Sequence, residues 1–414
     1  MHMATLTLLI HQAFASKDEP GGTRHYELGK RLVEQGQAFT VVASDVSYQT
    51  GKRLVPRIQL VTESNEDGIR ILRAYTYSAL HKSYLSRVIS FLTFMATSVL
   101  VGIRAGRPDV VMGTTPPIFQ AVSAWLLAVL HRRPFLLEVR DLWPEFAIDI
   151  GLLKNRALIR IARWLEGFLY ERADCLLVNS PAYRDYMIEK GITPTKIRLI
   201  PNGVDPDMFH IAACGKPIRD RYHLGEKFVA TYAGAIGMAN DIDVILKAAE
   251  ILIPRNDIQI LIVGDGKERS RLEAEANRLG LRNVTFTGPY PKSQMADVLA
   301  ASDACIAILR NIKMFTTTYP NKVFDYMAAG RPTVLAIDGV IREVIERANG
   351  GIFVRPGDPQ GLADALKQLA DNRRSAKTMG QNAREYVVKH FNRAEHARHF
   401  AELIARVASR QAPV

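Results

Sequence analysis

Short apolar runs alternate with amphipathic segments along almost all of the first 200 residues. The amphipathic segments carry apolar side chains every three or four positions, which predicts helices. The runs are fully apolar or rich in β-branched residues, which predicts strands of a parallel sheet that is covered on both faces. The predicted strands lie at 5–10, 39–43, 69–74, 110–113, 135–138 and 175–179, and the predicted helices at 23–34, 118–130 and 156–172.

The pattern stops at 199–206 and then begins again. This stretch holds two prolines and an Asn-Gly pair, so we expect a turn or a linker. Beyond it the predicted strands lie at 228–232, 258–263, 284–287, 304–308 and 333–336. The predicted helices lie at 242–253, 268–279, 322–329, 362–370 and 392–408.

Two sets of alternating strands and helices predict two α/β domains, joined near residue 203. Each domain would be a doubly wound, Rossmann-like parallel sheet. Ligands of such sheets bind outside the carboxyl ends of the strands, beside helix N-termini. We therefore expect the domains to face a cleft, with the chemistry on the turns that follow the strands.

Composition and charge narrow the class of protein. Of 414 residues 48% are hydrophobic and 23% charged, so disorder, collagen and coiled coil are excluded for the whole chain. The net charge of +12 favours an anionic partner, but the charge is spread and no nucleic-acid reader motif occurs, so nucleic acid is not expected. The three cysteines match no metal or disulfide spacing, which favours a reducing compartment.

Three glycine turns follow predicted strands. Gly21 and Gly22 precede the first predicted helix, and Gly234, then Gly264 with Asp265, follow strands of the second half. Glycine lets the backbone approach a ligand closely, and the free N–H groups of a helix N-terminus attract an anion. These turns suit a diphosphate. The alternative is a set of tight strand-to-helix turns without a ligand, with Asp265 as a helix cap.

A fourth motif combines a helix start with a cation. Asn321 is expected to cap a helix that carries Lys322 in its first turn, where the helix dipole disfavours a positive charge. A bound anion would explain this lysine. Asp325 lies one turn further along nearly the same face. The alternative is a surface pair of opposite charges.

A fifth motif gathers charges at the end of a predicted strand. Glu138, Arg140, Asp141 and Glu145 lie there among apolar residues. Arginine and carboxylates together at a strand's carboxyl end are typical of an active site. The alternative is a salt bridge of Arg140 that supports the domain interface.

The apolar segment 88–103 carries no charged residue and lies between Arg87 and Arg104. At 16 residues it is shorter than the span of about 20 that a membrane requires. Between residues 70 and 107 there are six basic residues and no acidic one, which suits an anionic membrane surface. The alternative is a buried helix of the first domain.

Taken together, the motifs resemble those of glycosyltransferase family 4, retaining nucleotide-sugar transferases of the GT-B fold. The most specific are IPNGVDPDMF at 200–209, LIVGDGKERSRLE at 261–273 and YPNKVFDYMAAGRP at 319–332. RDLWPE at 140–145 and EPGGTRHYELGKRL at 19–32 resemble the branch that adds amino sugars in surface-polysaccharide and lipid-linked oligosaccharide assembly. The resemblance runs from Pro20 to about His390.

The resemblance implies a donor site, with Lys322 on the phosphate, Asp325 on the ribose and Tyr290 by the base. The donor-binding residues would be Gly21, Gly22, Gly234, Gly264, Asp265, Tyr290, Thr317, Asn321, Lys322 and Asp325. Asp141 would orient or deprotonate the acceptor hydroxyl, so Asp141 and Lys322 are the expected catalytic residues. The other acceptor-side residues would be Arg24, Glu138, Arg140 and Glu145, with the two glutamates as fallback carboxylates.

The sequence departs from the family pattern twice. Thr317 stands where the family has the first acidic residue of its paired-Glu motif, eight positions before Asp325. The basic pair that is common after Gly234 is absent. Positive charge for the leaving phosphate would then come from Lys322. Further cations that could help are Arg24, Arg140 and Arg310. We expect neither a metal nor another cofactor to be needed.

The leading hypothesis is a retaining transferase that moves an N-acetylhexosamine-type sugar from a UDP donor to a lipid-linked saccharide or oligosaccharide. Residues 1–203 would bind the acceptor, 204–390 the nucleotide sugar, and 391–414 would form a helix packing back on the first domain. The expected location is the cytoplasm, peripheral on the inner face of the membrane. The alternatives are a UDP-sugar 2-epimerase, which would need no membrane acceptor, and a non-catalytic sugar-nucleotide-binding partner.

Overall fold

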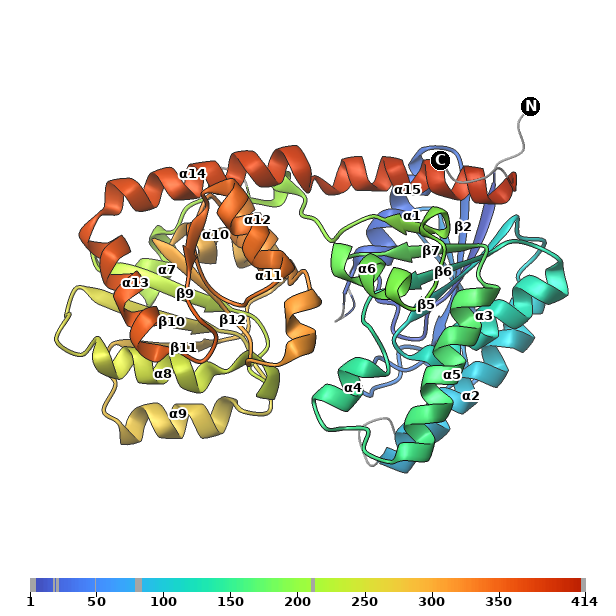
Figure 1. Ribbon diagram of the computed structural model, residues 1–414, viewed down its shortest axis with the longest axis horizontal. Coiled ribbons are helices and arrows are strands. Elements are labelled where there is room, and N and C mark those ends of the chain that lie inside the picture. Colours follow the sequence, from blue (N-terminus) through green and yellow to red (C-terminus); the bar gives the residue numbers. More distant parts are fainter. Residues whose placement is uncertain are drawn as a thin grey trace. The chain divides into compact units, whose positions relative to one another are not determined.

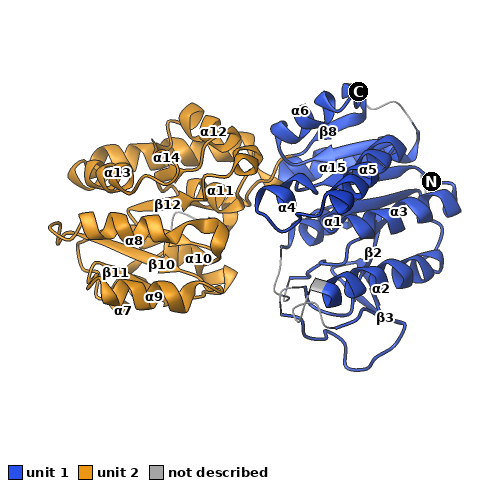
Figure 2. Ribbon diagram, turned by 60° about the horizontal axis from the view of Figure 1, so that its bottom comes forward, with its two compact units in different colours: residues 1–200, 394–414 blue, residues 201–393 orange. Residues whose placement is uncertain are grey.

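The computed structural model describes residues 5–17, 19, 22–48, 50–78, 84–209 and 213–410. The chain divides into two compact units, which are residues 1–200 with 394–414 (unit 1) and residues 201–393 (unit 2) (Figure 2). Each unit is built around one sheet with helices on both faces. The domain boundaries expected from the sequence lie after residues 203 and 390, and the roles expected for the domains stay predictions.

The sheet of unit 1 has, among the described residues, eight strands in the order β3-β4-β2-β1-β5-β6-β7-β8. Its central strands are buried along nearly their whole length, which is why they are apolar without alternation. The strands are β1 (Leu6–Ile10), β2 (Ala38–Ser44), β3 (Val61–Glu66), β4 (Ile69–Ala74), β5 (Val110–Thr115), β6 (Phe135–Val139), β7 (Cys175–Val178) and β8 (Ile197–Leu199).

Helices cover both faces of this sheet. α1 and α15 share one core with Val110 and Met112 of β5, whereas α3 lies on the other face, against Gly113. α2, α3 and α5 lie side by side on that second face (Figure 1). The helices of unit 1 are α1 (Arg24–Glu34), α2 (Tyr84–Ile103), α3 (Ile118–His131), α4 (Glu145–Asp149), α5 (Arg156–Arg172), α6 (Pro181–Glu189) and α15 (Arg393–Ala408).

Both edge strands of unit 1, β3 and β8, are missing from the strands expected from the sequence. β3 is polar and pairs antiparallel with β4, so no apolar run marks it. Asp67 and Gly68 join the two strands with φ angles of 48° and 81°. Two consecutive residues in the left-handed region are typical of the tight turns of β-hairpins, and Asp-Gly is a preferred pair there.

The apolar segment of the sequence forms a longer helix than expected. α2 has 20 residues. Within the part of the chain that the structure describes, Leu85–Ile103 is the one helix long and apolar enough to span a membrane, although core helices pass the same test. Phe94 and Val101 are buried, whereas Leu85 and Leu100 are exposed. α2 therefore has a buried face and an exposed apolar face, and the expected alternative of a buried helix holds for one face only.

The sheet of unit 2 has, within the described ranges, six parallel strands in the order β11-β10-β9-β12-β13-β14. Its strands are β9 (Phe228–Ala233), β10 (Ile258–Val263), β11 (Val284–Gly288), β12 (Ala304–Ile308), β13 (Thr333–Ala336) and β14 (Gly351–Phe353). α8, α9 and α13 pack on one face and α10, α11, α12 and α14 on the other. The helices are α7 (Lys216–Arg221), α8 (Ile242–Ile251), α9 (Arg269–Arg278), α10 (Met295–Ala300), α11 (Asn321–Ala328), α12 (Val340–Ala348), α13 (Pro359–Asp371) and α14 (Arg373–His390).

Candidate active site

The carboxyl ends of β9, β10 and β11 meet at one edge of the sheet of unit 2 because these strands are parallel neighbours. The turns beyond β9 and β10, together with the start of α11, line a cavity of about 360 Å³. Six residues expected at the donor site are among its lining residues, namely Gly234, Gly264, Asp265, Tyr290, Lys322 and Asp325. The fold thus brings together side chains from four separate segments of the sequence.

The glycine turns of this cavity pack backbone against backbone. The amide of Gly234 donates to the carbonyl of Val263 over 2.9 Å, and that of Gly264 donates to the carbonyl of Gly288 over 3.0 Å. Gly264 has a φ of 143°, and a Cβ on it would lie 1.9 Å from the carbonyl oxygen of Gly234. A side chain at position 264 would therefore force the two turns apart.

Lys322 lies in the first turn of α11 and reaches the cavity. Its Nζ donates to the hydroxyl of Tyr232 over 2.9 Å and to Oδ1 of Asn240 over 3.1 Å. Both partners are neutral, and burial lowers the pKa of Lys322 to about 7. A bound anion would favour the charged form of this lysine and raise its pKa. A partly buried cation at a helix N-terminus is a suitable place for a phosphate.

Tyr232 and Asn240 are residues of this site that no sequence motif predicted. Tyr232 belongs to β9, and its hydroxyl donates to the carbonyl of Ala235 while it accepts from Lys322. Asn240 lies in the region where the expected basic pair is absent. No local pattern marks either residue, because their role depends on a lysine more than 80 positions away.

Two of the expected helix caps are wrong. α9 begins at Arg269, and the Asp265 carboxylate instead accepts from the amide of Gly266. Asn321 is the first residue of α11 rather than its cap, and Pro320 precedes the helix without a side-chain hydrogen bond. Asp265 therefore has no capping role in α9. It lines the cavity instead.

Some expected donor residues do not line the cavity of unit 2. The hydroxyl of Thr317 donates to the carbonyl of Met314, and neither Thr317 nor Asn321 is among the lining residues. Gly22 is an exposed residue of unit 1, and Gly21 lies outside the described residues. The donor roles of these four residues stay predictions.

Asp141 follows β6 in unit 1. The amide of its neighbour Arg140 donates to the carbonyl of Thr115 over 3.3 Å, which ties this turn to the end of β5. Burial raises the pKa of Asp141 to about 6, although the charge of Arg140 opposes the shift. A carboxylate of this pKa is ionised at neutral pH and can still accept a proton, as a general base requires.

Glu138 lies deep inside unit 1, with 0% of its surface exposed. Arg24 Nε donates to it over 3.0 Å, the ring of His25 contacts its other oxygen, and Thr114 donates over 3.2 Å. Burial opposes its ionisation, but the charges of His25 and Arg24 outweigh burial and hold the pKa of Glu138 well below its usual range. Glu138 thus anchors α1 to β6.

The other acceptor-side residues are also engaged within unit 1. Arg24 donates to the carbonyl of Ile200 over 2.9 Å. Glu145 accepts two hydrogen bonds from Arg163, over 2.7 and 2.9 Å, which join α4 to α5. Arg140 contacts His11 over 3.3 Å. These pairs describe how the side chains are held, and their roles toward an acceptor stay predictions.

Two Asp-x-Asp tripeptides, at 205–207 and 241–243, bear on the expectation that no metal is needed. This motif is suited to divalent cations because carboxylates are hard oxygen ligands. In unit 2 the carboxylate of Asp205 accepts from the amide of Asp207, and that of Asp243 forms an ion pair with Arg271 at 2.8 Å. Metal independence therefore stays a prediction.

Two family sequence models cover most of the chain. The one described as "Glycosyl transferase 4-like domain" matches residues 21–203, and the one described as "Glycosyl transferases group 1" matches residues 227–372. The chain belongs to glycosyltransferase family 4. The predicted family is thus confirmed, and the chain is an enzyme of the glycosyltransferase class.

Curated relatives of this glycosyltransferase carry matching descriptions. The chain is 26% identical over 300 residues to "Probable glycosyltransferase WbjE" of Pseudomonas aeruginosa, which covers 70% of this chain and 74% of the relative. It is 25% identical over 315 residues to "Putative colanic acid biosynthesis glycosyl transferase WcaI" of Escherichia coli (strain K12), covering 73% and 77%. The same family of activity is named in both.

The fold of this glycosyltransferase is GT-B, as predicted. Anabaena HepE, solved in complex with UDP, superposes with a TM-score of 0.73 at 17% identity and covers 97% of this chain and 99% of that one. At this identity the likeness shows the fold alone. The cleft expected between the two domains stays a prediction.

Proposed function

We propose that this enzyme transfers an N-acetylhexosamine-type sugar from a UDP donor to a lipid-linked saccharide during surface-polysaccharide assembly, with retention of the anomeric configuration. The observation that carries the proposal is the cavity of unit 2, in which Lys322 and the start of α11 lie beside the glycine turns. These features suit the charged phosphates of a nucleoside diphosphate. The assignment to surface-polysaccharide assembly is supported by the relative WcaI, which is named for colanic acid biosynthesis.

The choice of donor rests on the cavity and on a fold relative. In our proposal the diphosphate binds Lys322 and the N-terminus of α11, the ribose hydroxyls bind Asp325, and the base lies beside Tyr290. Lys322, Asp325 and Tyr290 all line the cavity. HepE, which has the same fold, was solved with UDP. We extend that nucleotide to this enzyme as the donor class.

The proposed chemistry follows from charge. Sugar transfer requires stabilisation of the departing UDP while positive charge develops at the anomeric carbon. Protonated Lys322 and the dipole of α11 supply the stabilisation. Asp141 orients the acceptor hydroxyl and partly deprotonates it as a general base, and the leaving phosphate helps by taking up the proton on the face of the sugar from which UDP departs. The new bond then forms on that same face, which gives retention.

The acceptor side is proposed to lie at a membrane. α2, α3 and α5 expose large apolar side chains, which we call the apolar helical face. They are Leu85, Ile89, Leu92, Leu100, Ile103, Leu126, Val129, Leu130, Leu158, Ile161 and Trp164. Arg87, Arg104 and Arg160 are exposed on or next to the same helices. Exposed apolar residues flanked by cations suit an anionic membrane surface, so we infer a peripheral enzyme on the inner face of the cytoplasmic membrane.

Thermal shift with UDP, GDP and ADP, with and without EDTA, tests the donor site. We expect UDP to stabilise unit 2 selectively and EDTA to change nothing. At a ligand concentration of 100 times Kd the stabilisation would be about 2.7 kcal/mol. Loss of the shift in EDTA would overturn the metal-free proposal, and preference for GDP or ADP would overturn the donor. The absence of any shift would overturn the donor site proposed in unit 2.

Sedimentation with anionic vesicles tests the apolar helical face. The double variant Leu92→Glu, Val129→Glu should bind vesicles about tenfold less tightly or worse, because each large apolar side chain removed from water contributes about 1.5–3 kcal/mol. The matched control is Ile253→Glu, Val388→Glu, whose apolar side chains are exposed on unit 2. Equal binding of the two double variants would contradict the proposal.

A further inference from the structure

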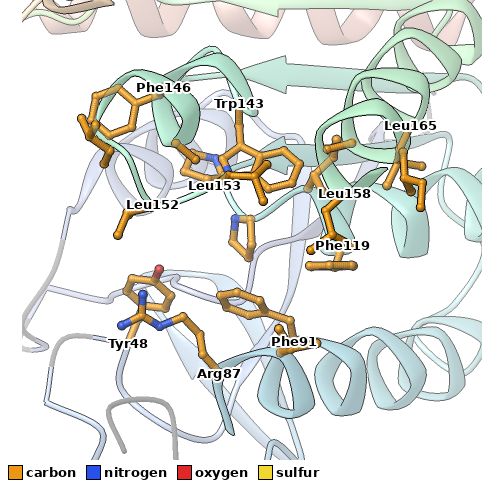
Figure 3. Close-up of a pocket in the computed structure, with 18 residues that line it drawn as sticks. Tyr48, Arg87, Phe91, Phe119, Trp143, Phe146, Leu152, Leu153, Leu158 and Leu165 are labelled. Atoms are coloured by element: carbon orange, nitrogen blue, oxygen red, sulfur yellow. The ribbon is translucent and has the colours of Figure 1, made fainter. Parts of the chain in front are cut away.

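An apolar pocket of about 330 Å³ lies within unit 1 and has no part in the activity described so far. It is enclosed by the start of α2, the start of α3, α4 and α5. Figure 3 shows the rings of Phe91, Phe119 and Trp143 and the leucines of α5 around it. Its lining is aliphatic and aromatic except for the Trp143 indole nitrogen and two polar side chains, Tyr48 and Arg87.

The two polar side chains share one end of the pocket. Figure 3 shows the Tyr48 ring and the Arg87 side chain next to each other. The charges of Arg87, Arg140 and Asp141 all act on the Tyr48 hydroxyl, so this end lies near the expected acceptor carboxylate. The backbone also brings Asp141 close to the lining residue Trp143, because the amide of Trp143 donates to the carbonyl of Asp141 over 2.9 Å. Asp141 is not itself in the lining, but it lies two positions from the lining residue Trp143, near the end of the pocket that holds Tyr48.

The other side of the pocket is continuous with the apolar helical face. Leu158 and Ile161 of α5 line the pocket, yet 47% and 58% of their surfaces are exposed. Leu152, also in the lining, is 67% exposed. Leu158 and Ile161 therefore belong both to the pocket and to the apolar helical face, and Leu152 adds a further exposed apolar side chain at the pocket. A hydrocarbon chain can thus pass from a membrane into the pocket without crossing a polar surface.

We propose that this pocket binds the hydrocarbon chain of a prenyl phosphate carrier, with the phosphate on Arg87 and the attached saccharide at Asp141. The inference rests on the proposed function and deepens it by giving the lipid part of the acceptor its own site. The pocket is a single cavity of about 330 Å³, which suits a carrier with one chain better than a glycerolipid with two. The lining excludes water from the chain, and Arg87 matches the negative charge of the phosphate.

Intrinsic fluorescence of Trp143 reports occupancy directly. We would titrate the full chain with farnesyl phosphate below its micellar concentration, without vesicles or donor. A saturable change is expected, and Trp143→Phe should remove it while Trp125 and Trp164 remain. Farnesol, which lacks the phosphate, should bind the unchanged protein about tenfold less tightly. Dioctanoyl phosphatidic acid, which has two chains, should bind poorly, and binding equal to that of farnesyl phosphate would overturn the single-chain assignment.

Three variants separate the pocket from the surface around it. Leu158→Asp places a charge in the lining at a half-exposed position and should weaken farnesyl phosphate binding at least tenfold. Val129→Asp, on the apolar helical face but outside the lining, should leave it within twofold. Arg87→Gln should weaken farnesyl phosphate about tenfold and leave farnesol unchanged. If Leu158→Asp and Val129→Asp bind farnesyl phosphate equally, the pocket is not its site.

UDP binding by unit 2, measured by thermal shift on the same preparations, distinguishes a failure of the lipid site from a failure of the proposed function. Leu158→Asp should retain the UDP shift, which shows that unit 2 is intact, and an unchanged near-UV circular dichroism spectrum would show that unit 1 is folded. A UDP shift without saturable farnesyl phosphate binding would overturn the lipid site alone. Farnesyl phosphate binding without any nucleotide shift would overturn the donor proposal and leave the lipid site standing.

Discussion

The cavity of unit 2 and the pocket of unit 1 have similar volumes, about 360 and 330 Å³, but opposite chemistry. The cavity of unit 2 lies at the carboxyl ends of parallel strands, and its lining combines apolar side chains with glycine backbone, Lys322 and two aspartates. The pocket of unit 1 lies between helices and is lined by aromatic rings and branched aliphatic chains. We propose a charged ligand for the cavity of unit 2 and a hydrocarbon for the pocket of unit 1.

This difference in chemistry makes one site easier to find in a sequence than the other. The polar cavity depends on glycines whose backbone must adopt positive φ and on a cation at a helix start, and these leave short, recognisable motifs. The apolar pocket depends on ordinary core residues contributed by four helices. Nothing distinguishes Phe91 or Leu158 in the sequence from residues of a closed core.

Asp141→Asn should give the largest effect, because it removes the expected base without changing either pocket. We expect the rate of sugar transfer from UDP-N-acetylglucosamine to a membrane lipid extract to fall about 10³-fold, within the range that general bases contribute. UDP and farnesyl phosphate affinities should not change. Asp149→Asn, on the exposed end of α4, is the matched control. A similar loss in that control would remove Asp141 from the mechanism.

The pH profile sharpens the role of Asp141. Burial raises the pKa of Asp141 to about 6 in the folded protein, so the active, ionised form is lost as the pH falls below 6. Transfer by the unchanged enzyme should therefore decline about tenfold per pH unit on the acidic side. The residual activity of Asp141→Asn should lack this limb. An identical acidic limb in the variant would assign the titration to another group.

Lys322→Met tests the site built for a charged ligand. Removing a charge-assisted contact costs about 1.5–3 kcal/mol, so UDP should bind about tenfold to 100-fold less tightly by calorimetry. Farnesyl phosphate should bind as before, since its proposed site is in unit 1. Lys247→Met, on the exposed face of α8, is the control and should keep full UDP affinity. Equal loss of both ligands in Lys322→Met would mean that the fold, rather than the site, has changed.

UDP affinity should depend on pH through Lys322. Burial lowers the pKa of this lysine to about 7, and a bound diphosphate favours its protonated form. Affinity should therefore fall as the pH rises above 7, by up to about tenfold per unit, because binding must then take up a proton. Calorimetry of UDP from pH 6 to 9 measures this, and Lys322→Met should show a flat profile over the same range.

Alanine substitutions at two glycines expected at the donor site should have the smallest effects, and they should change the stability of the fold by different amounts. Gly264→Ala places a Cβ 1.9 Å from a carbonyl oxygen and should destabilise unit 2 by about 1–3 kcal/mol. Gly22→Ala meets nothing within 4 Å and should change stability by less than about 0.5 kcal/mol. Denaturant unfolding compares them. An equally stable Gly264→Ala would show that the turns of unit 2 can move apart.

Much of this protein follows from the order of its residues. Fully apolar runs alternating with amphipathic segments predict two doubly wound parallel sheets, because a strand covered on both faces needs no polar side. Lys322 and Asp325 are three positions apart on one helix, so their shared side of the cavity follows from helical periodicity. The hairpin of β3 leaves no such pattern in the sequence, since an edge strand can be polar.

Only the tertiary structure decided the rest. It brought Tyr232 and Asn240 within hydrogen-bond distance of Lys322. Because both partners are neutral, nothing offsets the desolvation that lowers the pKa of this lysine to about 7. It held Glu138 in an ion network of unit 1 and left α2 with one buried and one exposed apolar face. It also left an apolar pocket in unit 1 among residues whose sequence pattern is that of a closed core. The sequence determines which side chains prefer to leave water, and only packing determines whether another side chain or an open space meets them.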